Sequence, residues 1–190
     1  MSRFIVIDGL DASGKSTQAE MLAEYLRGIG KTCLVRNHPS GDNFFGVKGR
    51  EYLFIEGKKA HIAASLFYLV DVIRSITFYA WRRVDYIIFV RYLLGTAYLP
   101  SPAHRLAYGF FSRLVPTKGS LIYLNVSPSE AARRVTENRV KKERFENLEE
   151  LSKTAAKAKD LVSDGKWIIV DGDKRVDEIH REILRASGVV

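Results

Sequence analysis

The chain has 190 residues, 46% of them apolar and 27% charged, which is the composition of one soluble globular domain long enough to bury a core. Because the first apolar run begins almost at Met1, and the longest one, Ile62 to Val70, stops at Asp71, we expect neither a signal peptide nor a membrane span. The single cysteine, Cys33, excludes an internal disulfide and fits a cytoplasmic location, and with four scattered histidines it argues against a transition-metal site.

The formal net charge of +8 indicates an anionic partner. Clustered cations serve either nucleic acid or a small substrate that carries several phosphates. The alternation of aromatic and basic residues that is typical of single-strand binders is missing from the sequence. We therefore expect small phosphorylated molecules as partners, rather than nucleic acid or a membrane.

Five short apolar runs are predicted strands, because near-continuous β-branched runs are typical of strands buried on both faces. In chain order they are Phe4–Ile7, Thr32–Val35, Tyr86–Val90, Leu121–Val126 and Trp167–Val170. Segments of helical period lie between them, including Lys15–Arg27, about Lys59–Trp81, Pro128 to about Asn138, and about Arg175–Ala186. This alternation predicts an α/β fold in three layers (α/β/α), with a five-stranded parallel sheet covered by helices on both faces, in one domain over residues 1–190.

A phosphate-binding loop is predicted between the first strand and the first helix, where the sequence follows the pattern G-x-x-x-x-G-K-[ST]. Its glycines let successive backbone N–H groups curl around a phosphate, and the helix N-terminus adds partial positive charge. Lys15 can reach the β- and γ-phosphates of ATP or GTP, and the Ser16 hydroxyl can ligate Mg²⁺. The predicted nucleotide-binding residues are Gly9, Leu10, Asp11, Ala12, Ser13, Gly14, Lys15, Ser16 and Thr17.

The ends of the predicted strands point to the same place. Ligands of parallel α/β sheets lie at the carboxyl ends of the strands. Gly9, Arg36, Arg91 and Asp171 all follow predicted strands directly. One site at that edge of the sheet is therefore expected.

Six segments, in order, resemble the thymidylate kinases of the P-loop nucleoside monophosphate kinases. They are IDGLDASGKSTQAEML, Arg36 with Pro39 and Gly41, Leu66-Phe67, Arg91-Tyr92 with Ala97-Tyr98, Glu143-Arg144-Phe145-Glu146, and WIIVDGD. The resemblance implies a P-loop kinase fold with a short lid at about residues 139–147, and transfer of the ATP γ-phosphate to the 5′-phosphate of dTMP, giving dTDP. Such a transfer needs two aligned nucleotides and neutralised charge rather than covalent chemistry.

The resemblance also implies residues for the acceptor phosphate and base. Arg91 would clamp the acceptor phosphate and stabilise the transferred group, and Arg36 would contact the same phosphate. Phe67 would stack on thymine, and Arg74 lies one or two residues from the family's base-reading arginine. Taken without the resemblance, Phe67 also fits a core position and Arg91 a surface arginine at a strand end.

The sugar would be recognised by two further residues. Asp11 corresponds to the acidic residue that meets the deoxyribose 3′-hydroxyl in the family. Tyr98 corresponds to the aromatic residue that crowds a ribose 2′-hydroxyl, although it also fits ordinary packing.

The catalytic arginine is expected in the lid, because family members carry it either there or in the phosphate loop. Here the loop has Ala12 and Ser13, so Arg139 and Arg144 are the candidates, with Lys15 and Arg91 as the other catalytic residues. The same run of cations is also compatible with a solvated helix end.

Two further expectations concern metal and assembly. Asp8 would hold Mg²⁺ through water beside Ser16, with ATP as the phosphate donor. The long helix of about Lys59–Trp81 carries a broad apolar stripe, which in the family forms a dimer interface, so a homodimer is expected.

One departure from the family concerns the third strand, where the family has aspartate before arginine and this chain has Val90 before Arg91. That carboxylate is thought to help hold the metal and the acceptor phosphate. Three readings follow: an active kinase for dTMP with reduced or altered activity, a degenerate nucleotide-binding relative, or a kinase for another nucleotide or nucleoside.

Overall fold

A computed structural model of the chain describes residues 2–55, 58–79, 81–114, 119–138 and 148–190. The strands are β1 (Arg3–Gly9), β2 (Cys33–Asn37), β3 (Tyr86–Val90), β4 (Ser120–Asn125) and β5 (Trp167–Asp171). The helices are α1 (Lys15–Gly28), α2 (Phe44–Tyr52), α3 (Lys58–Tyr79), α4 (Ala103–Leu114), α5 (Pro128–Asn138), α6 (Leu148–Val162) and α7 (Val176–Ala186), with a short 3-10 helix, η1, at Leu94–Tyr98. All five predicted strands are confirmed.

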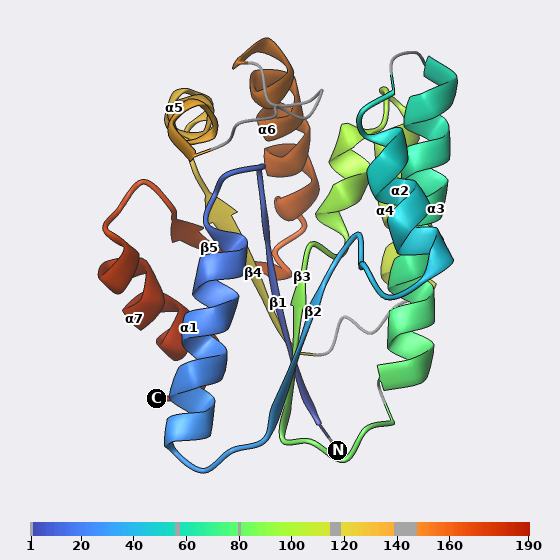
Figure 1. Cartoon of the computed structure of the whole chain (residues 1–190). Coiled ribbons are helices and arrows are strands. Elements are labelled where there is room, and N and C mark those ends of the chain that lie inside the picture. The colour runs from blue at the N-terminus through green and yellow to red at the C-terminus, as the bar shows by residue number, and fades with distance from the viewer. Residues whose placement is uncertain (1, 56–57, 80, 115–118, 139–147) are drawn as a thin grey trace.

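The sheet is entirely parallel, with the strand order β2-β3-β1-β4-β5, as the alternating pattern predicts. Figure 1 shows α1 and α7 on one side of it and α2, α3 and α4 on the other. Each side has its own apolar core: α1 and α7 pack on one, and α3, α4 and α6 contribute to the other. The three-layer α/β/α fold is therefore confirmed.

Burial follows the position of each strand in the sheet. Every residue of β3 is buried, as is most of β1 and β4, because helices cover both faces of these central strands. The edge strands β2 and β5 are partly exposed. The chain leaves β1 between β3 and β4, so the loop after β1 opens at the point where the strand order reverses, which is where parallel sheets bind ligands.

Helix α3 departs from the expectation that its apolar run ends at Asp71. Over Ile62–Tyr79 it is long and apolar enough to cross a membrane by length and composition alone. Asp71 lies inside that stretch, fully buried, and accepts hydrogen bonds from the backbone N–H and hydroxyl of Ser40 and from the amide of Asn43. These bonds tie α3 to the segment between β2 and α2.

Candidate active site

The loop after β1 has the curled backbone that a phosphate requires. Gly9 has φ +153°, and a Cβ there would lie 2.7 Å from the carbonyl oxygen of Leu124, so no side chain fits. Ala12 and Gly14 also have positive φ, and Gly14 caps α1. The N-terminus of α1 therefore faces the inside of the loop, at the carboxyl edge of the sheet.

Lys15 is buried across this loop. Its Nζ donates hydrogen bonds to the carbonyl of Gly9 at 3.0 Å, to the carbonyl of Leu10, and to the hydroxyl of Ser13 at 3.3 Å. The ammonium group thus lies against the loop that would surround a triphosphate.

A cavity of about 480 Å³ opens over the loop and is large enough for part of a nucleotide. Its lining comprises Ala12, Ser13, Gly14, Lys15, Ser16, Thr17, Gln18, Arg91, Arg133, Arg134, Glu137, Val176 and Ile179. Six of the nine residues predicted from the loop pattern are therefore brought to this donor cavity. Gly9, Leu10 and Asp11 are not part of this lining. Asp11 lines a different cavity, described below.

The sequence reasoning missed two arginines of α5 in the donor cavity. Arg133 pairs with Glu130 and Glu137, and Arg134 pairs with Glu130 and donates to the carbonyl of Gly172 at 3.0 Å. The signal was available, because β4 neighbours β1, and the helix that follows β4 therefore begins beside the phosphate loop.

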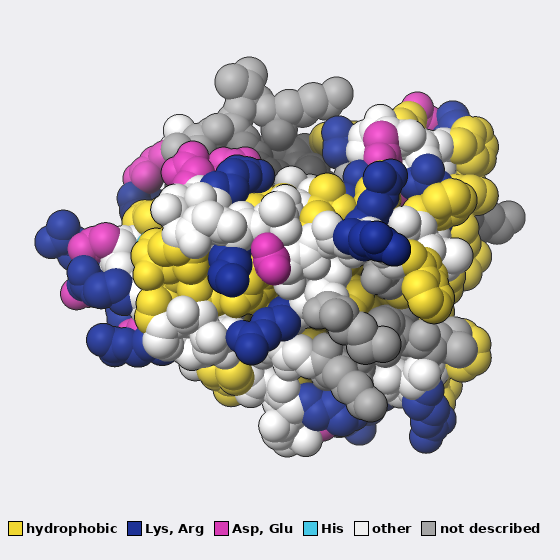
Figure 2. All heavy atoms as spheres, turned by 90° about the horizontal axis from the view of Figure 1, so that it is seen from below, with side chains coloured by type: hydrophobic (Ala, Val, Ile, Leu, Met, Phe, Trp, Pro, Cys, Tyr) yellow, Lys and Arg dark blue, Asp and Glu magenta, His cyan; other side chains and the backbone are white. Residues whose placement is uncertain are grey.

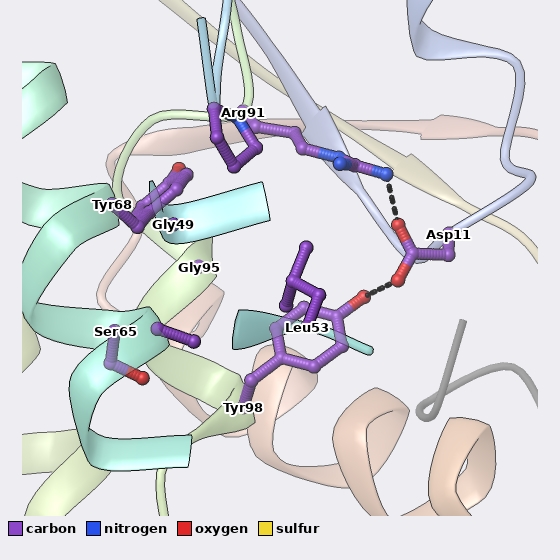
Figure 3. A pocket seen from close by; sticks show the side chains of 10 residues that line it. Asp11, Gly49, Leu53, Ser65, Tyr68, Arg91, Gly95 and Tyr98 are labelled. Carbon is purple, nitrogen blue, oxygen red and sulfur yellow. Dashed lines mark hydrogen bonds and ion pairs between the residues drawn. The ribbon is translucent and has the colours of Figure 1, made fainter. Parts of the chain in front are cut away.

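A second, smaller cavity of about 60 Å³ lies on the other side of the loop, between α2, α3 and η1. It is lined by Asp11, Pro39, Gly49, Leu53, Ala64, Ser65, Tyr68, Arg91, Gly95 and Tyr98. Figure 3 shows Asp11 lying between Arg91 and Tyr98, which reach it from the end of β3 and from η1. Arg91 forms an ion pair with the Asp11 carboxylate, and the Tyr98 hydroxyl donates to it at 2.7 Å.

Arg91 is the residue that the two described cavity linings share. A guanidinium at this position can contact anionic groups from both sides at once. Two phosphorylated ligands, one in each cavity, would therefore meet at Arg91.

Asp8 has a structural task in this site. One carboxylate oxygen accepts from the N–H of Gly9 at 2.9 Å, and the other from the N–H groups of Tyr92 and Leu94 at 2.9 and 3.0 Å. Burial raises the pKa of Asp8, while these N–H groups and Lys15 oppose the shift. The residue ties the phosphate loop to the turn at residues 91–94, and it is not among the residues that line the donor cavity.

Ser16 fits a magnesium site better than Asp8. It is exposed and lines the donor cavity at the start of α1. In phosphate sites Mg²⁺ takes most of its ligands from phosphates and water, so one hydroxyl from the protein is enough. Within the described ranges, no group of three or more His, Cys, Asp or Glu side chains could hold a metal by itself.

The comparisons with known proteins agree with this layout. The protein-family model of thymidylate kinase matches residues 7–183. The chain belongs to the thymidylate kinase family. A probable thymidylate kinase of Methanococcus aeolicus is 29% identical to it over 97% of this chain and 95% of the relative. Thymidylate kinases of a Sulfurihydrogenibium species and of Plasmodium falciparum are 30% and 25% identical over 97% and 96% of this chain, and over 96% and 88% of their own lengths.

Membership of the thymidylate kinase family confirms the predicted class, an ATP-dependent phosphotransferase. The expected lid at residues 139–147, with Arg139 and Arg144, lies outside the described residues. The remaining candidate residues are described, and not all of them line the second, smaller cavity, which we call the acceptor cavity.

Arg36 and Arg74 lie away from both cavities. Arg36 makes two hydrogen bonds to the Asp42 carboxylate, at 2.8 and 3.0 Å, and its guanidinium lies 4.3 Å from the centre of the Tyr79 ring. Arg74 lies 3.9 Å from the same carboxylate. The pair with Arg36 lowers the pKa of Asp42. Neither arginine lines the acceptor cavity, and two residues, Asn37 and His38, separate Arg36 from Pro39, which does.

Tyr68, rather than Phe67, lines the acceptor cavity. Phe67 stacks on Tyr52 with ring centres 5.5 Å apart and packs edge-on against Phe44. Consecutive helical residues point about 100° apart, and Tyr68 shares its face of α3 with Ala64 and Ser65. That spacing was the signal in the sequence that could have identified it.

Val90 takes the place of the family's aspartate in a fully apolar setting. It is 2% exposed and belongs to the core on the α1 side of the sheet, with Ile7 and Ile88. A carboxylate at this position would point toward the side of the sheet on which α1 carries Lys15.

Proposed function

We propose that this chain transfers the γ-phosphoryl group of ATP to the 5′-phosphate of dTMP. The observation that carries the proposal is Arg91, whose side chain lies where the donor and acceptor cavities meet. Phosphoryl transfer requires two aligned phosphorylated ligands and a positive charge between them, and the two cavities with Arg91 between them fit this requirement. Membership of the thymidylate kinase family supports dTMP as the acceptor.

The chain's own residues divide the work. Lys15 and the backbone N–H groups of the loop hold the triphosphate, and Ser16 would hold the Mg²⁺ that neutralises phosphate charge when bound. Arg91 contacts the acceptor phosphate and the phosphoryl group that is being transferred. Asp11 holds Arg91 and Tyr98 in place and accepts a hydrogen bond from the sugar 3′-hydroxyl.

A substrate panel tests this proposal. The purified protein is incubated with ATP, Mg²⁺ and each deoxynucleoside monophosphate in turn, and nucleoside diphosphates are separated by chromatography. We expect dTDP as the main product, and no product from the Lys15→Ala variant, which lacks the cation of the phosphate loop. GTP in place of ATP determines donor preference in the same assay.

The rival function is nucleotide binding without turnover, and its support is Val90 in place of aspartate. ATP binding seen by calorimetry, with no diphosphate formed from any acceptor, would favour the rival and remove the kinase proposal. Formation of a diphosphate from a different acceptor would keep the enzyme class and change the substrate.

We also propose a homodimer, formed through α3. Ile62, Leu66, Val70 and Ile73 are each at least 38% exposed and follow one another at helical spacing. Figure 2 shows apolar side chains along the flank of the molecule that carries α2 and α3. Size-exclusion chromatography with light scattering should give twice the monomer mass for the wild-type protein. The Leu66→Glu variant should give the mass of the monomer. A wild-type monomer would contradict the proposal.

A cytoplasmic location is proposed on two grounds. The family is one of soluble kinases, and the chain has a single cysteine, Cys33, which is unpaired. Fractionation of cells with an antibody against the protein would test it.

A further inference from the structure

Arg91 reaches the junction of the two cavities from a backbone position that needs support. Its φ is +60°, in the left-handed region that side chains other than glycine rarely adopt. Such a conformation persists only where the surrounding structure holds it. The groups that hold the turn at residues 91–94 therefore set the direction of the Arg91 side chain.

Several of these groups are already described. The Arg91 N–H donates to the carbonyl of Ile7 at 3.2 Å, and Asp8 accepts from the N–H groups of Tyr92 and Leu94 in the turn. The Tyr68 hydroxyl donates to the carbonyl of Tyr92 at 3.0 Å. The carbonyl of Arg91 itself lies 3.1 Å from Nδ1 of His38.

His38 is placed by the sheet to make this contact. It follows β2 as Arg91 follows β3, and its backbone N–H donates to the carbonyl of Val90 at 3.0 Å, which extends the ladder between the two strands. Its ring is 2% exposed, stacks on Phe89 with centres 5.8 Å apart, and meets Tyr68 edge-on. The imidazole is thus fixed in both position and plane.

The proton of the ring can be assigned from its partner. A carbonyl oxygen only accepts, so Nδ1 of His38 must carry the hydrogen and donate it to Arg91. Burial lowers the pKa of His38 to about 4, so the ring is neutral at physiological pH. Nε2 is buried with no hydrogen-bond partner among the described residues, which leaves the bond to Arg91 as the polar contact of the ring.

We propose that His38 is a positioning residue for phosphoryl transfer, which acts by donating Nδ1–H to the carbonyl of Arg91. The bond secures the left-handed backbone of Arg91 and so aims its guanidinium at the junction of the cavities. This inference rests on the proposed kinase function. It also gives a role to one of the two residues that separate Arg36 from Pro39.

Two variants of His38 test the proposal. Asparagine carries an N–H on the atom bonded to Cγ, as histidine does at Nδ1, whereas phenylalanine keeps a ring and removes the donor. We expect kcat for dTMP to fall about 10- to 100-fold in His38→Phe, since small displacements of a catalytic group have effects of this size. The KM for ATP should stay within about twofold, because the phosphate loop is untouched, and His38→Asn should recover kcat to within about threefold of wild type.

His104 provides the matched control. It is also a buried histidine, 4% exposed, but it lies on α4 beside Asp160, away from both cavities. His104→Phe should leave kcat unchanged. Wild-type kcat in a folded His38→Phe, or equal losses in His38→Phe and His38→Asn, would overturn the proposal.

The protonated nitrogen of His38 can also be identified directly in the wild-type protein, without a variant and without measuring activity. Nitrogen-15 NMR of the His38 ring should show the proton on Nδ1 and no titration between pH 6 and 8. A proton on Nε2 would overturn the proposal even in an active enzyme. If the wild type makes no dTDP while the proton lies on Nδ1, the kinase function fails and the hydrogen bond stands.

Discussion

Asp11 belongs by sequence to the phosphate loop and by position to the acceptor cavity. Its carboxylate is 6% exposed and holds both the Arg91 guanidinium and the Tyr98 hydroxyl. Under the proposed function, an incoming acceptor phosphate would compete with Asp11 for Arg91, and Tyr98 would lie beside the sugar. One short carboxylate thus aligns the groups of the acceptor cavity before substrate binds, which reduces what binding must reorganise.

Val90→Asp tests whether the missing carboxylate limits the rate. The new side chain would lie at the end of β3 on the side of the sheet that carries α1 and Lys15, where it can assist metal and phosphate binding. We expect kcat for dTMP to rise, together with a lower melting temperature, because a carboxylate replaces an apolar side chain that is 2% exposed. Val90→Thr, which is close in volume but lacks the charge, is the control.

The rates of both Val90 variants are measured under saturating ATP and dTMP. An unchanged or lower kcat in a folded Val90→Asp would show that this chain has rearranged its metal chemistry around valine.

The buried His38 ring predicts a stability difference with pH. Its pKa falls from an ordinary 6.5 to about 4 in the folded protein, chiefly because of burial. Between these pH values the unfolded chain binds a proton at His38 that the folded protein excludes. The contribution of His38 to the stability of the folded protein is therefore full above pH 6.5, and protonation of the unfolded chain lowers it as the pH falls toward 4. Between pH 7 and pH 4 we expect the free energy of unfolding to fall by roughly 3 kcal/mol more for wild type than for His38→Asn.

Urea denaturation at a series of pH values gives this difference. The comparison with His38→Asn is essential, because the pKa values of His104 and His180 are also lowered by burial, whereas that of Asp8 is raised. If the free energies of unfolding of the two proteins changed with pH in the same way, the lowered pKa of His38 would be contradicted.

The structure brings some of the predicted site residues to the two cavities and leaves others outside both linings. The phosphate loop and Arg91 line the donor cavity because each follows directly from a strand end, and strand ends converge in a parallel sheet. The resemblance predicts Arg36 and Arg74 in the acceptor site, whereas in the structure both pair with Asp42 and neither lines a described cavity. Pairing with Asp42 depends on how the chain turns after β2, which no local pattern records.

At the scale of elements, α3 combines an apolar exposed stripe with a buried carboxylate. Asp71 fixes α3 against the segment after β2 through hydrogen bonds of 2.6 to 2.7 Å from Ser40 and Asn43. This segment and α3 together supply Pro39, Ser65 and Tyr68 to the acceptor cavity. The position of that cavity therefore depends on a contact between elements.

Asp71→Ala should destabilise the protein by about 3 kcal/mol or more, since it leaves the buried donors of Ser40 and Asn43 without an acceptor. Chemical denaturation monitored by circular dichroism measures this. Glu149→Ala, which removes one partner of an exposed ion pair on α6, should cost less than about 1 kcal/mol. Similar small losses for the two variants would contradict the role given to Asp71.

At the scale of the whole molecule, the sequence predicted the architecture and left the cavities undetermined. Five short apolar runs separated by helical segments predict a parallel sheet almost without alternatives. The strand order places β1 beside both β3 and β4, and this brings Arg91 and α5 to opposite sides of one loop. The volume and lining of each cavity depend on side-chain packing between distant segments, which strand and helix patterns do not encode.

A single ligand that spans both cavities tests this arrangement of the molecule. Adenosine joined to thymidine through five phosphates should bind more tightly than ATP or dTMP alone, and at saturating concentration it should raise the melting temperature by on the order of 5 °C. Arg91→Ala should lose most of the stabilisation given by the linked ligand, because Arg91 lines both cavities. The stabilisation given by ATP alone should fall less, because Lys15 and the phosphate loop still line the donor cavity. Arg185→Ala, on the exposed side of α7, should behave as wild type. Equal stabilisation by ATP and by the linked ligand in the wild-type protein would mean that the two cavities do not form one continuous site.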